Sequence, residues 1–167
     1  MFKEIEALPA HLGAVPDRPR GPALATRADS AAEVAAALER QLAQCRRRRS
    51  VLGLVCIAIE AIEGAAEREG VGADLERRAT DEVVHRICGH VRGGDLVLCS
   101  DDRHACVILP GAGDQAVRRI AARFLRALNG LYRIDEALLN VTVRVGSASH
   151  PQDGSMAQEL LQRATER

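Results

Sequence analysis

Apolar residues recur at helical spacing from residue 29 onward, where Val34, Leu38 and Leu42 mark one face of a helix. Either Asp29 or Ser30 can cap this helix, because both side chains accept hydrogen bonds from free backbone N–H groups. The pattern then predicts, in chain order, a strand over 51–62, a helix over 75–91, a hairpin with strands 95–99 and 106–109, a helix over 116–128, a strand over 139–149 and a closing helix over 155–165. This order predicts an α+β fold in which helices cover a mostly antiparallel sheet.

Residues 1–28 differ from the rest of the chain. They carry four of the six prolines and show no lasting periodicity, which predicts an extended or partly disordered arm. The remaining residues, 29–167, are enough for one compact domain with its own core, since 47% of the chain is apolar.

Composition excludes several classes of function. Lys and Arg total 23, as do Asp and Glu, so no bulk charge recruits nucleic acid or an anionic membrane. Aromatic residues make up 2% of the chain, which argues against stacking platforms for single strands. The sequence has neither an apolar run long enough to span a membrane nor a secretory leader. Five cysteines without Cys-x-x-Cys spacing predict reduced, buried thiols and a cytoplasmic location.

Two short motifs flank the first strand of the predicted hairpin. Arg-Gly-Gly-Asp at 92–95 precedes Asp-Asp-Arg-His-Ala at 101–105 by five residues, and an apolar strand ending in Pro-Gly follows at 107–111. Together with the run 141–154 and the closing helix, this order resembles the diguanylate cyclase (GGDEF) family. In that family an Arg-x-x-Asp inhibitory site precedes the catalytic Gly-Gly-Asp/Glu-Glu-Phe turn. The resemblance covers about residues 29–167 and implies the nucleotidyl-cyclase palm fold.

The resemblance implies that the catalytic turn is degenerate. Its residues here are Asp101, Asp102, Arg103, His104 and Ala105. A cation and an imidazole replace the signature carboxylates, and Ala58 stands where the family has its first-strand metal ligand. Carboxylates hold the divalent metals that polarise a triphosphate, so we expect no catalytic residues, no metal and no cofactor. The two aspartates also add negative charge where the family's glycines admit the nucleotide.

A residual enzyme with a shifted metal site is an alternative. Glu60 lies near the first metal position and can hold an ion, alone or with Asp101 or Asp102. The competing interpretation is that Glu60 ends a strand and that the two aspartates are ordinary turn residues. The positions of the family's guanine-recognising Asn and Asp fall near Ala66 and Arg77, which supports loss of catalysis.

The resemblance implies that the inhibitory site is retained. Arg92 and Asp95 match its motif, and Arg123, thirteen residues after Pro110, matches a second arginine that the family often adds. An arginine fork bonds guanine O6 and N7 or a phosphate, and an aspartate accepts from guanine N1 and N2. These residues imply binding of cyclic di-GMP. Since Arg123 can come from a neighbouring copy, ligand binding is expected to join two protomers.

Two alternatives remain open at the sequence level. The tetrapeptide 92–95 is also typical of a helix end with a surface ion pair, which would leave a ligand-free scaffold that binds a protein effector through the altered turn, the arm or the first helix. The run Arg46–Arg49 fits either a phosphate-binding patch or a solvated helix end that complements the helix dipole.

Overall fold

The computed structural model describes residues 25–28, 30–64 and 71–166. Its elements are β1 (Ala25–Arg27), α1 (Ala31–Arg48), β2 (Leu52–Glu63), α2 (Val71–Gly89), β3 (Leu96–Cys99), β4 (His104–Pro110), α3 (Asp114–Leu128), β5 (Gly130–Ile134), β6 (Ala137–His150) and α4 (Ala157–Glu166). Every helix among these residues is too short or too polar to cross a bilayer.

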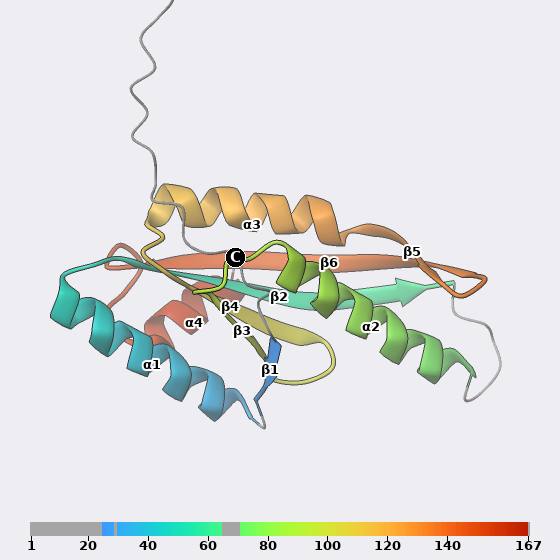
Figure 1. The fold of residues 1–167 in the computed structure, drawn as a ribbon, viewed down its shortest axis with the longest axis horizontal. Coiled ribbons are helices and arrows are strands. Elements are labelled where there is room, and N and C mark those ends of the chain that lie inside the picture. Colours follow the sequence, from blue (N-terminus) through green and yellow to red (C-terminus); the bar gives the residue numbers. More distant parts are fainter. Residues whose placement is uncertain (1–24, 29, 65–70, 167) are drawn as a thin grey trace, which may run out of the picture.

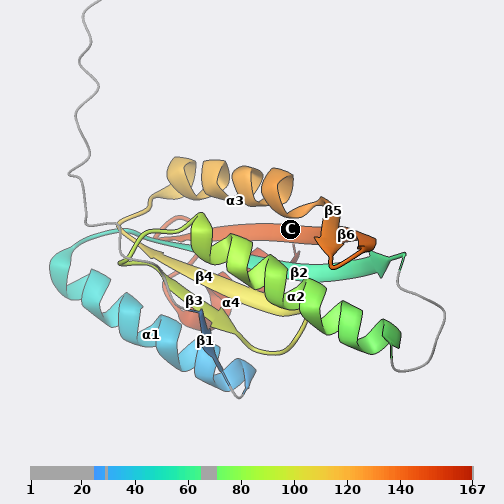
Figure 2. The same ribbon diagram turned by 45° about the vertical axis from the view of Figure 1, so that its right-hand side comes forward.

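The strands form one six-stranded sheet in the order β1-β3-β4-β2-β6-β5. The pair β1–β3 is parallel and the other four neighbouring pairs are antiparallel. Figure 1 shows α3 above the sheet and α1 with α4 below it, and the turned view in Figure 2 keeps this arrangement. The predicted α+β fold, a mostly antiparallel sheet covered by helices, is confirmed.

The sheet separates two hydrophobic cores because successive strand residues point to opposite faces. Along β2, Val55 and Ile57 pack with residues of α2 and α3, whereas Leu54 and Cys56 pack with residues of α1 and α4. The central strand is therefore apolar on both faces over its first half, which is why the sequence there reads as an unbroken apolar run.

The first helix begins and ends on local signals. Ser30 is its N-cap, and its side-chain oxygen accepts a hydrogen bond from the Glu33 backbone N–H at 3.4 Å. Asp29, the other predicted cap, lies outside the described residues. Arg49 ends the helix in the left-handed conformation at φ 48°, and its backbone N–H bonds back to the last turn. Arg46–Arg48 thus form the basic last turn of α1.

The segment predicted as an extended or partly disordered arm joins the sheet at its C-terminal end. Ala25–Arg27 form strand β1, which pairs with β3, and Ala28 is buried with its N–H donating to the Cys99 carbonyl at 2.8 Å. A strand of three exposed residues has no periodicity to detect, so only its partner strand reveals it. Residues 1–24 of the arm lie outside the described part of the chain.

The sequence also missed strand β5. Its five residues pair with the start of β6 through a tight turn at Asp135, which takes φ 54°. Tyr132 anchors the strand, because its ring is fully buried and its hydroxyl donates to the Leu128 carbonyl at 2.7 Å. The strand is short and follows a helix directly, so its sequence has too few alternations to predict it, and tertiary packing of Tyr132 and Ile134 decides its structure.

Candidate ligand-binding site

Residues 92–95 form a closed turn between α2 and β3. The Asp95 backbone N–H donates to the Arg92 carbonyl at 2.9 Å, and the Asp95 carboxylate accepts the Arg92 backbone N–H at 2.8 Å. Two glycines occupy the centre of this turn, and the Arg92 side chain is exposed. The turn therefore presents a guanidinium and a carboxylate from its two ends.

Arg123 comes to the same place from α3. Its Nη2 donates to the His90 carbonyl at 2.6 Å, just past the end of α2 and two residues before Arg92. The packing of α2 on α3 fixes this approach, since Ile87 and Phe124 share one core and the rings of His90 and Phe124 are 6.3 Å apart. The structure thus brings Arg92, Asp95 and Arg123 into one region of a single protomer.

The turn at 101–105, expected to correspond to the family's signature turn, is closed by Asp101. One oxygen of its carboxylate accepts the backbone N–H groups of Arg103 and His104, each at 2.7 Å, and the His104 ring lies 2.9 Å away. Burial alone would raise the pKa of Asp101, but the hydrogen bonds from Arg103 and His104 outweigh burial and lower that pKa below its ordinary value. Asp101 is therefore a structural acceptor in this turn.

Further contacts tie the signature turn to three neighbouring elements. Asp102 pairs with Arg27 of β1 at 2.8 Å, and Arg103 pairs with Glu76 of α2 at 3.2 Å. The Arg103 carbonyl also accepts the Ile59 backbone N–H of β2 at 2.8 Å. The first two contacts are exposed ion pairs, and each contributes little to the stability of the fold. Together the three contacts fix the position of the turn.

The space between the signature turn and α2 is nearly filled. It measures about 10 Å³ and is lined by residues 101–105 and by apolar side chains of β2 and α2, including Ile57, Ile59, Val83 and Ile87. That volume is about one water molecule. Ala58, which is expected at the family's first metal position, is paired with His104 in the ladder between β2 and β4.

Glu60, the remaining acid near that position, is engaged elsewhere. Its carboxylate pairs with Arg144 of β6 at 3.1 Å, and Arg144 also donates to the Thr165 carbonyl at 2.6 Å. Within the described ranges, no group of three or more His, Cys, Asp or Glu side chains has an arrangement that holds a metal ion.

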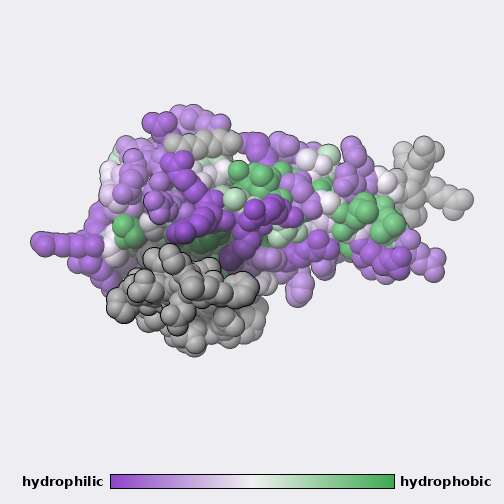
Figure 3. Space-filling view, turned by 90° about the horizontal axis from the view of Figure 1, so that it is seen from above, coloured by the Kyte–Doolittle hydropathy of each residue, from purple (hydrophilic) through white to green (hydrophobic). Residues whose placement is uncertain are grey.

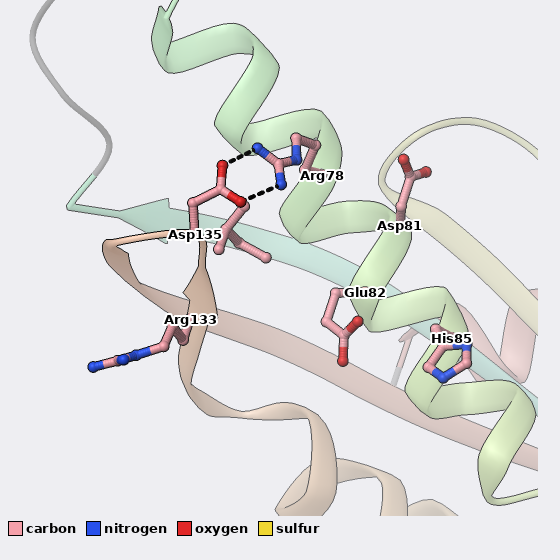
Figure 4. Close-up of a pocket in the computed structure, with 7 residues that line it drawn as sticks. Arg78, Asp81, Glu82, His85, Arg133 and Asp135 are labelled. Atoms are coloured by element: carbon pink, nitrogen blue, oxygen red, sulfur yellow. Dashed lines mark hydrogen bonds and ion pairs between the residues drawn. The ribbon is translucent and has the colours of Figure 1, made fainter.

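A larger polar pocket lies between α2 and the hairpin of β5 and β6. Its volume is about 490 Å³, and Figure 4 shows Arg78, Asp81, Glu82 and His85 lining it from α2. Arg78 and Asp135 form a bidentate ion pair, with one contact at 2.8 Å, and this pair lowers the pKa of Asp135. The sequence analysis did not predict this pocket, because one wall contains residues of β5, the strand that periodicity missed.

The surface on the α3 side is mainly polar. Figure 3 shows this face as largely hydrophilic, with small separate hydrophobic areas. Leu125 of α3 is among the large apolar side chains that remain exposed. This side of the molecule thus suits recognition of a polar ligand better than burial of a broad apolar partner.

No family model matches the sequence, and no curated protein matches it. Solved structures do match. A sensory box/GGDEF family protein from Caulobacter crescentus has a TM-score of 0.68 at 18% identity, over 82% of this chain and 88% of the other. The active GGEEF domain of a Vibrio cholerae diguanylate cyclase has a TM-score of 0.68 at 10% identity, over 82% and 86%.

Two further matches come from Pseudomonas aeruginosa. The GGDEF domain of YfiN (TpbB) has a TM-score of 0.67 at 21% identity, over 81% of this chain and 79% of the other. The diguanylate cyclase SiaD, solved in complex with its activator SiaC, has a TM-score of 0.57 at 16% identity, over 81% and 51%. The architecture and these likenesses together show that the chain has the fold of GGDEF domains.

Proposed function

We propose that this chain is a catalytically inactive GGDEF-like domain that acts as a receptor for cyclic di-GMP through Arg92, Asp95 and Arg123. One observation carries the proposal. The Arg123 guanidinium bonds the His90 carbonyl, two residues before the turn that Arg92 and Asp95 close, although Arg123 is far from that turn in sequence.

The three side chains supply the hydrogen bonds that a guanine nucleotide needs. The exposed Arg92 can bond guanine O6 and N7 through two donors, and a carboxylate such as Asp95 accepts several hydrogen bonds at once. Arg123 donates from Nη2 to the His90 carbonyl, and a guanidinium has five N–H donors in total. Further donors are therefore available for a ligand phosphate.

The geometry of the signature turn supports the absence of cyclase activity. The space beside the turn is about 10 Å³, and Asp101 and Asp102 place negative charge at its rim. A triphosphate with divalent metal requires carboxylate ligands, and Ala58 supplies none. The receptor is proposed to work in the cytoplasm without a metal or cofactor.

Isothermal titration of cyclic di-GMP into the wild-type protein and into Arg92→Ala tests the receptor proposal. We expect binding by the wild type and a loss of affinity of about 150-fold or more in the variant, the cost of about two charged hydrogen bonds. Arg40→Ala is the matched control, because Arg40 is exposed on α1 across the sheet. Wild-type protein without affinity at ligand concentrations on the order of 100 µM, in the weak range of binding free energies, would overturn the proposal.

Incubation with GTP and Mg²⁺ or Mn²⁺, followed by chromatography of the products, tests the inactivity separately. We expect GTP to be recovered unchanged. Metal-dependent formation of cyclic di-GMP would instead identify a residual enzyme, with Glu60, Asp101 and Asp102 as the first residues to substitute.

A second candidate function is a ligand-free scaffold for a protein effector. The signature turn is exposed from Asp101 to His104 and yet held by several contacts, which suits a rigid docking surface. SiaD, a protein of the same fold, was solved with its activator SiaC. Wild-type protein that captures an effector but binds no cyclic di-GMP would favour this function.

A further inference from the structure

Cys56 and Cys106 face each other across two central strands. Their sulfur atoms are 3.2 Å apart, and the two residues are direct partners in the ladder between β2 and β4. We propose that this pair is a reversible oxidation site that forms an intramolecular disulfide, with Cys106 oxidised first and Cys56 as the resolving thiol. The proposal concerns residues outside the ligand site and does not depend on cyclic di-GMP.

The backbone register places the pair where a disulfide fits. At one end of this ladder the Gly111 N–H donates to the Val51 carbonyl, and at the other the Ile59 N–H donates to the Arg103 carbonyl, both at 2.8 Å. Hydrogen-bonded pairs alternate with non-hydrogen-bonded pairs along an antiparallel ladder, and the register between these ends is continuous. Cys56 and Cys106 therefore form a non-hydrogen-bonded pair.

The separation of such a pair matches the requirement of the bond. Directly opposed residues at non-hydrogen-bonded positions have Cα atoms about 4.5 Å apart. Disulfides span Cα separations of about 4.4 to 6.8 Å. A disulfide can therefore form by closer approach of the two sulfur atoms alone, and the register of the strands stays unchanged.

The two thiols are not equivalent. Cys56 is buried at 8% exposure, whereas Cys106 is half-buried and more open to solvent. The contact between the two thiols lowers the pKa of Cys106, whereas the same contact and burial raise the pKa of Cys56. Cys106 is therefore the better nucleophile, since the thiolate is the reactive form.

The other three cysteines are less suited to this role. Burial raises the pKa of the Cys88 and Cys99 thiols, which disfavours their thiolates. Cys45 is buried in α1, and its thiol donates to the Val51 carbonyl at 3.7 Å. The contact at 3.2 Å singles out Cys56 and Cys106.

A peroxide is the proposed oxidant. The Cys106 thiolate attacks one peroxide oxygen, the O–O bond breaks, and after uptake of a proton the products are a Cys106 sulfenic acid and water. The Cys56 sulfur then attacks the Cys106 sulfur, the S–S bond forms, the S–O bond breaks, and the Cys56 proton leaves with the hydroxyl as a second water. Two electrons pass from the two sulfurs to the peroxide, and a dithiol reductant returns them.

Hydrogen peroxide treatment of the full chain under native conditions, followed by alkylation and mass spectrometry, tests the proposal. We expect two of the five thiols to be lost, a cross-linked peptide pair containing Cys56 and Cys106, and full recovery after dithiothreitol. Cys88→Ser should give the same linkage. Retention of all thiols, or a bond between Cys88 and Cys99, would overturn the proposal.

The order of the two steps is tested with serine variants. In Cys56→Ser the reaction should stop at a Cys106 sulfenic acid that dimedone traps, and in Cys106→Ser the remaining Cys56 should stay reduced. Trapping at Cys56 in place of Cys106 would refute the assigned roles. The linkage map of the wild-type protein needs no variant, so a serine variant that fails to fold leaves the disulfide itself testable.

Discussion

Single carboxylates shape both loops of the candidate region. Asp95 closes the turn at 92–95 by accepting the Arg92 N–H, and Asp101 closes the signature turn by accepting two backbone N–H groups. Aspartate favours such turns because its short side chain reaches the backbone a few residues away. In the turn at 101–105 the carboxylate of Asp101 thus serves the backbone of its own loop.

The first prediction concerns Asp101→Ala. We expect a loss of about 1 kcal/mol in the free energy of unfolding at neutral pH, because two backbone N–H groups lose their acceptor at an exposed site. The folded-state pKa of Asp101 lies below its ordinary value of 3.8, so its ionised form stabilises the fold above that pH. This stabilisation should disappear as the pH falls through the lowered folded-state pKa.

Urea titrations at pH 7 and at pH values below 3.8 measure this difference. The difference in free energy of unfolding between the wild type and Asp101→Ala should become smaller as the pH is lowered. Asp101→Asn is the matched control, since its amide oxygen still accepts while carrying no charge that titrates. If the difference in free energy of unfolding between the wild type and Asp101→Ala stays constant with pH, the charge of Asp101 does not contribute to stability.

The second prediction concerns Arg123. Arg123→Ala should lower the affinity for cyclic di-GMP about tenfold or more. The affinity of Arg123→Lys should lie between those of Arg123→Ala and the wild type, because an ammonium keeps the charge but loses the planar pair of donors of the guanidinium. Titration calorimetry gives the affinities. Thermal melting without ligand is the control, because loss of the contact with the His90 carbonyl could also loosen the end of α2. Unchanged affinity in both variants would remove Arg123 from the site.

The packing of α3 on the sheet depends on a glycine in the central strand. A Cβ atom at Gly53 would lie 2.0 Å from the Val117 side chain and 3.3 Å from that of Ala112. Gly53 therefore allows α3 to lie close to β2. Since α3 also carries Arg123, this close packing helps to position Arg123. Close approach of a helix to a strand is a common use of glycine.

The third prediction contrasts Gly53→Ala with Gly89→Ala. We expect Gly53→Ala to lower the free energy of unfolding by about 1–3 kcal/mol, because the added methyl overpacks the contact with α3. Gly89 ends α2 with nothing near its Cβ direction, so alanine there should be neutral or stabilising by about 0.5 kcal/mol. Urea denaturation compares the two. Equal effects would contradict the role of Gly53.

The fourth prediction concerns β1. A chain that begins at Asp29 should be about 2 kcal/mol less stable than one that begins at Ala25, because it loses the pairing with β3 and the buried Ala28. Denaturation of both truncations measures the difference. Equal stability would show that β1 is dispensable for the stability of the fold. A truncation that tests whether the arm binds an effector should begin at Ala25, because that chain keeps β1.

Across the whole molecule, the positive and negative charges balance. The equal numbers of basic and acidic residues give no long-range attraction between copies or toward polyanions. Association therefore has to come from a local site. The region of Arg92 and Arg123 combines two exposed cations with a bound carboxylate, which suits a ligand that carries two phosphates.

The fifth prediction is that cyclic di-GMP joins two protomers. Light scattering should show the mass doubling when ligand is added to the wild-type protein, because a stacked ligand pair can bond arginines from two copies. Arg92→Ala should stay at its ligand-free mass, and Arg40→Ala should behave as the wild type. Binding of ligand at constant mass would retain the receptor and exclude ligand-driven dimers.

The sequence by itself determined the order of the larger elements, the α+β class and the Arg-x-x-Asp turn. These features depend on local spacing, because helical periodicity, caps and glycine turns are properties of neighbouring residues. The resemblance to the GGDEF family could be found for the same reason, since its motifs are short and occur in order.

Only the tertiary structure decided which distant residues meet. It paired β1 with β3 and β5 with β6, placed Arg123 against the His90 carbonyl, and set Cys56 opposite Cys106. It also filled the space beside the signature turn. These outcomes depend on strand register and helix packing, which join residues far apart along the chain and leave no local pattern in the sequence.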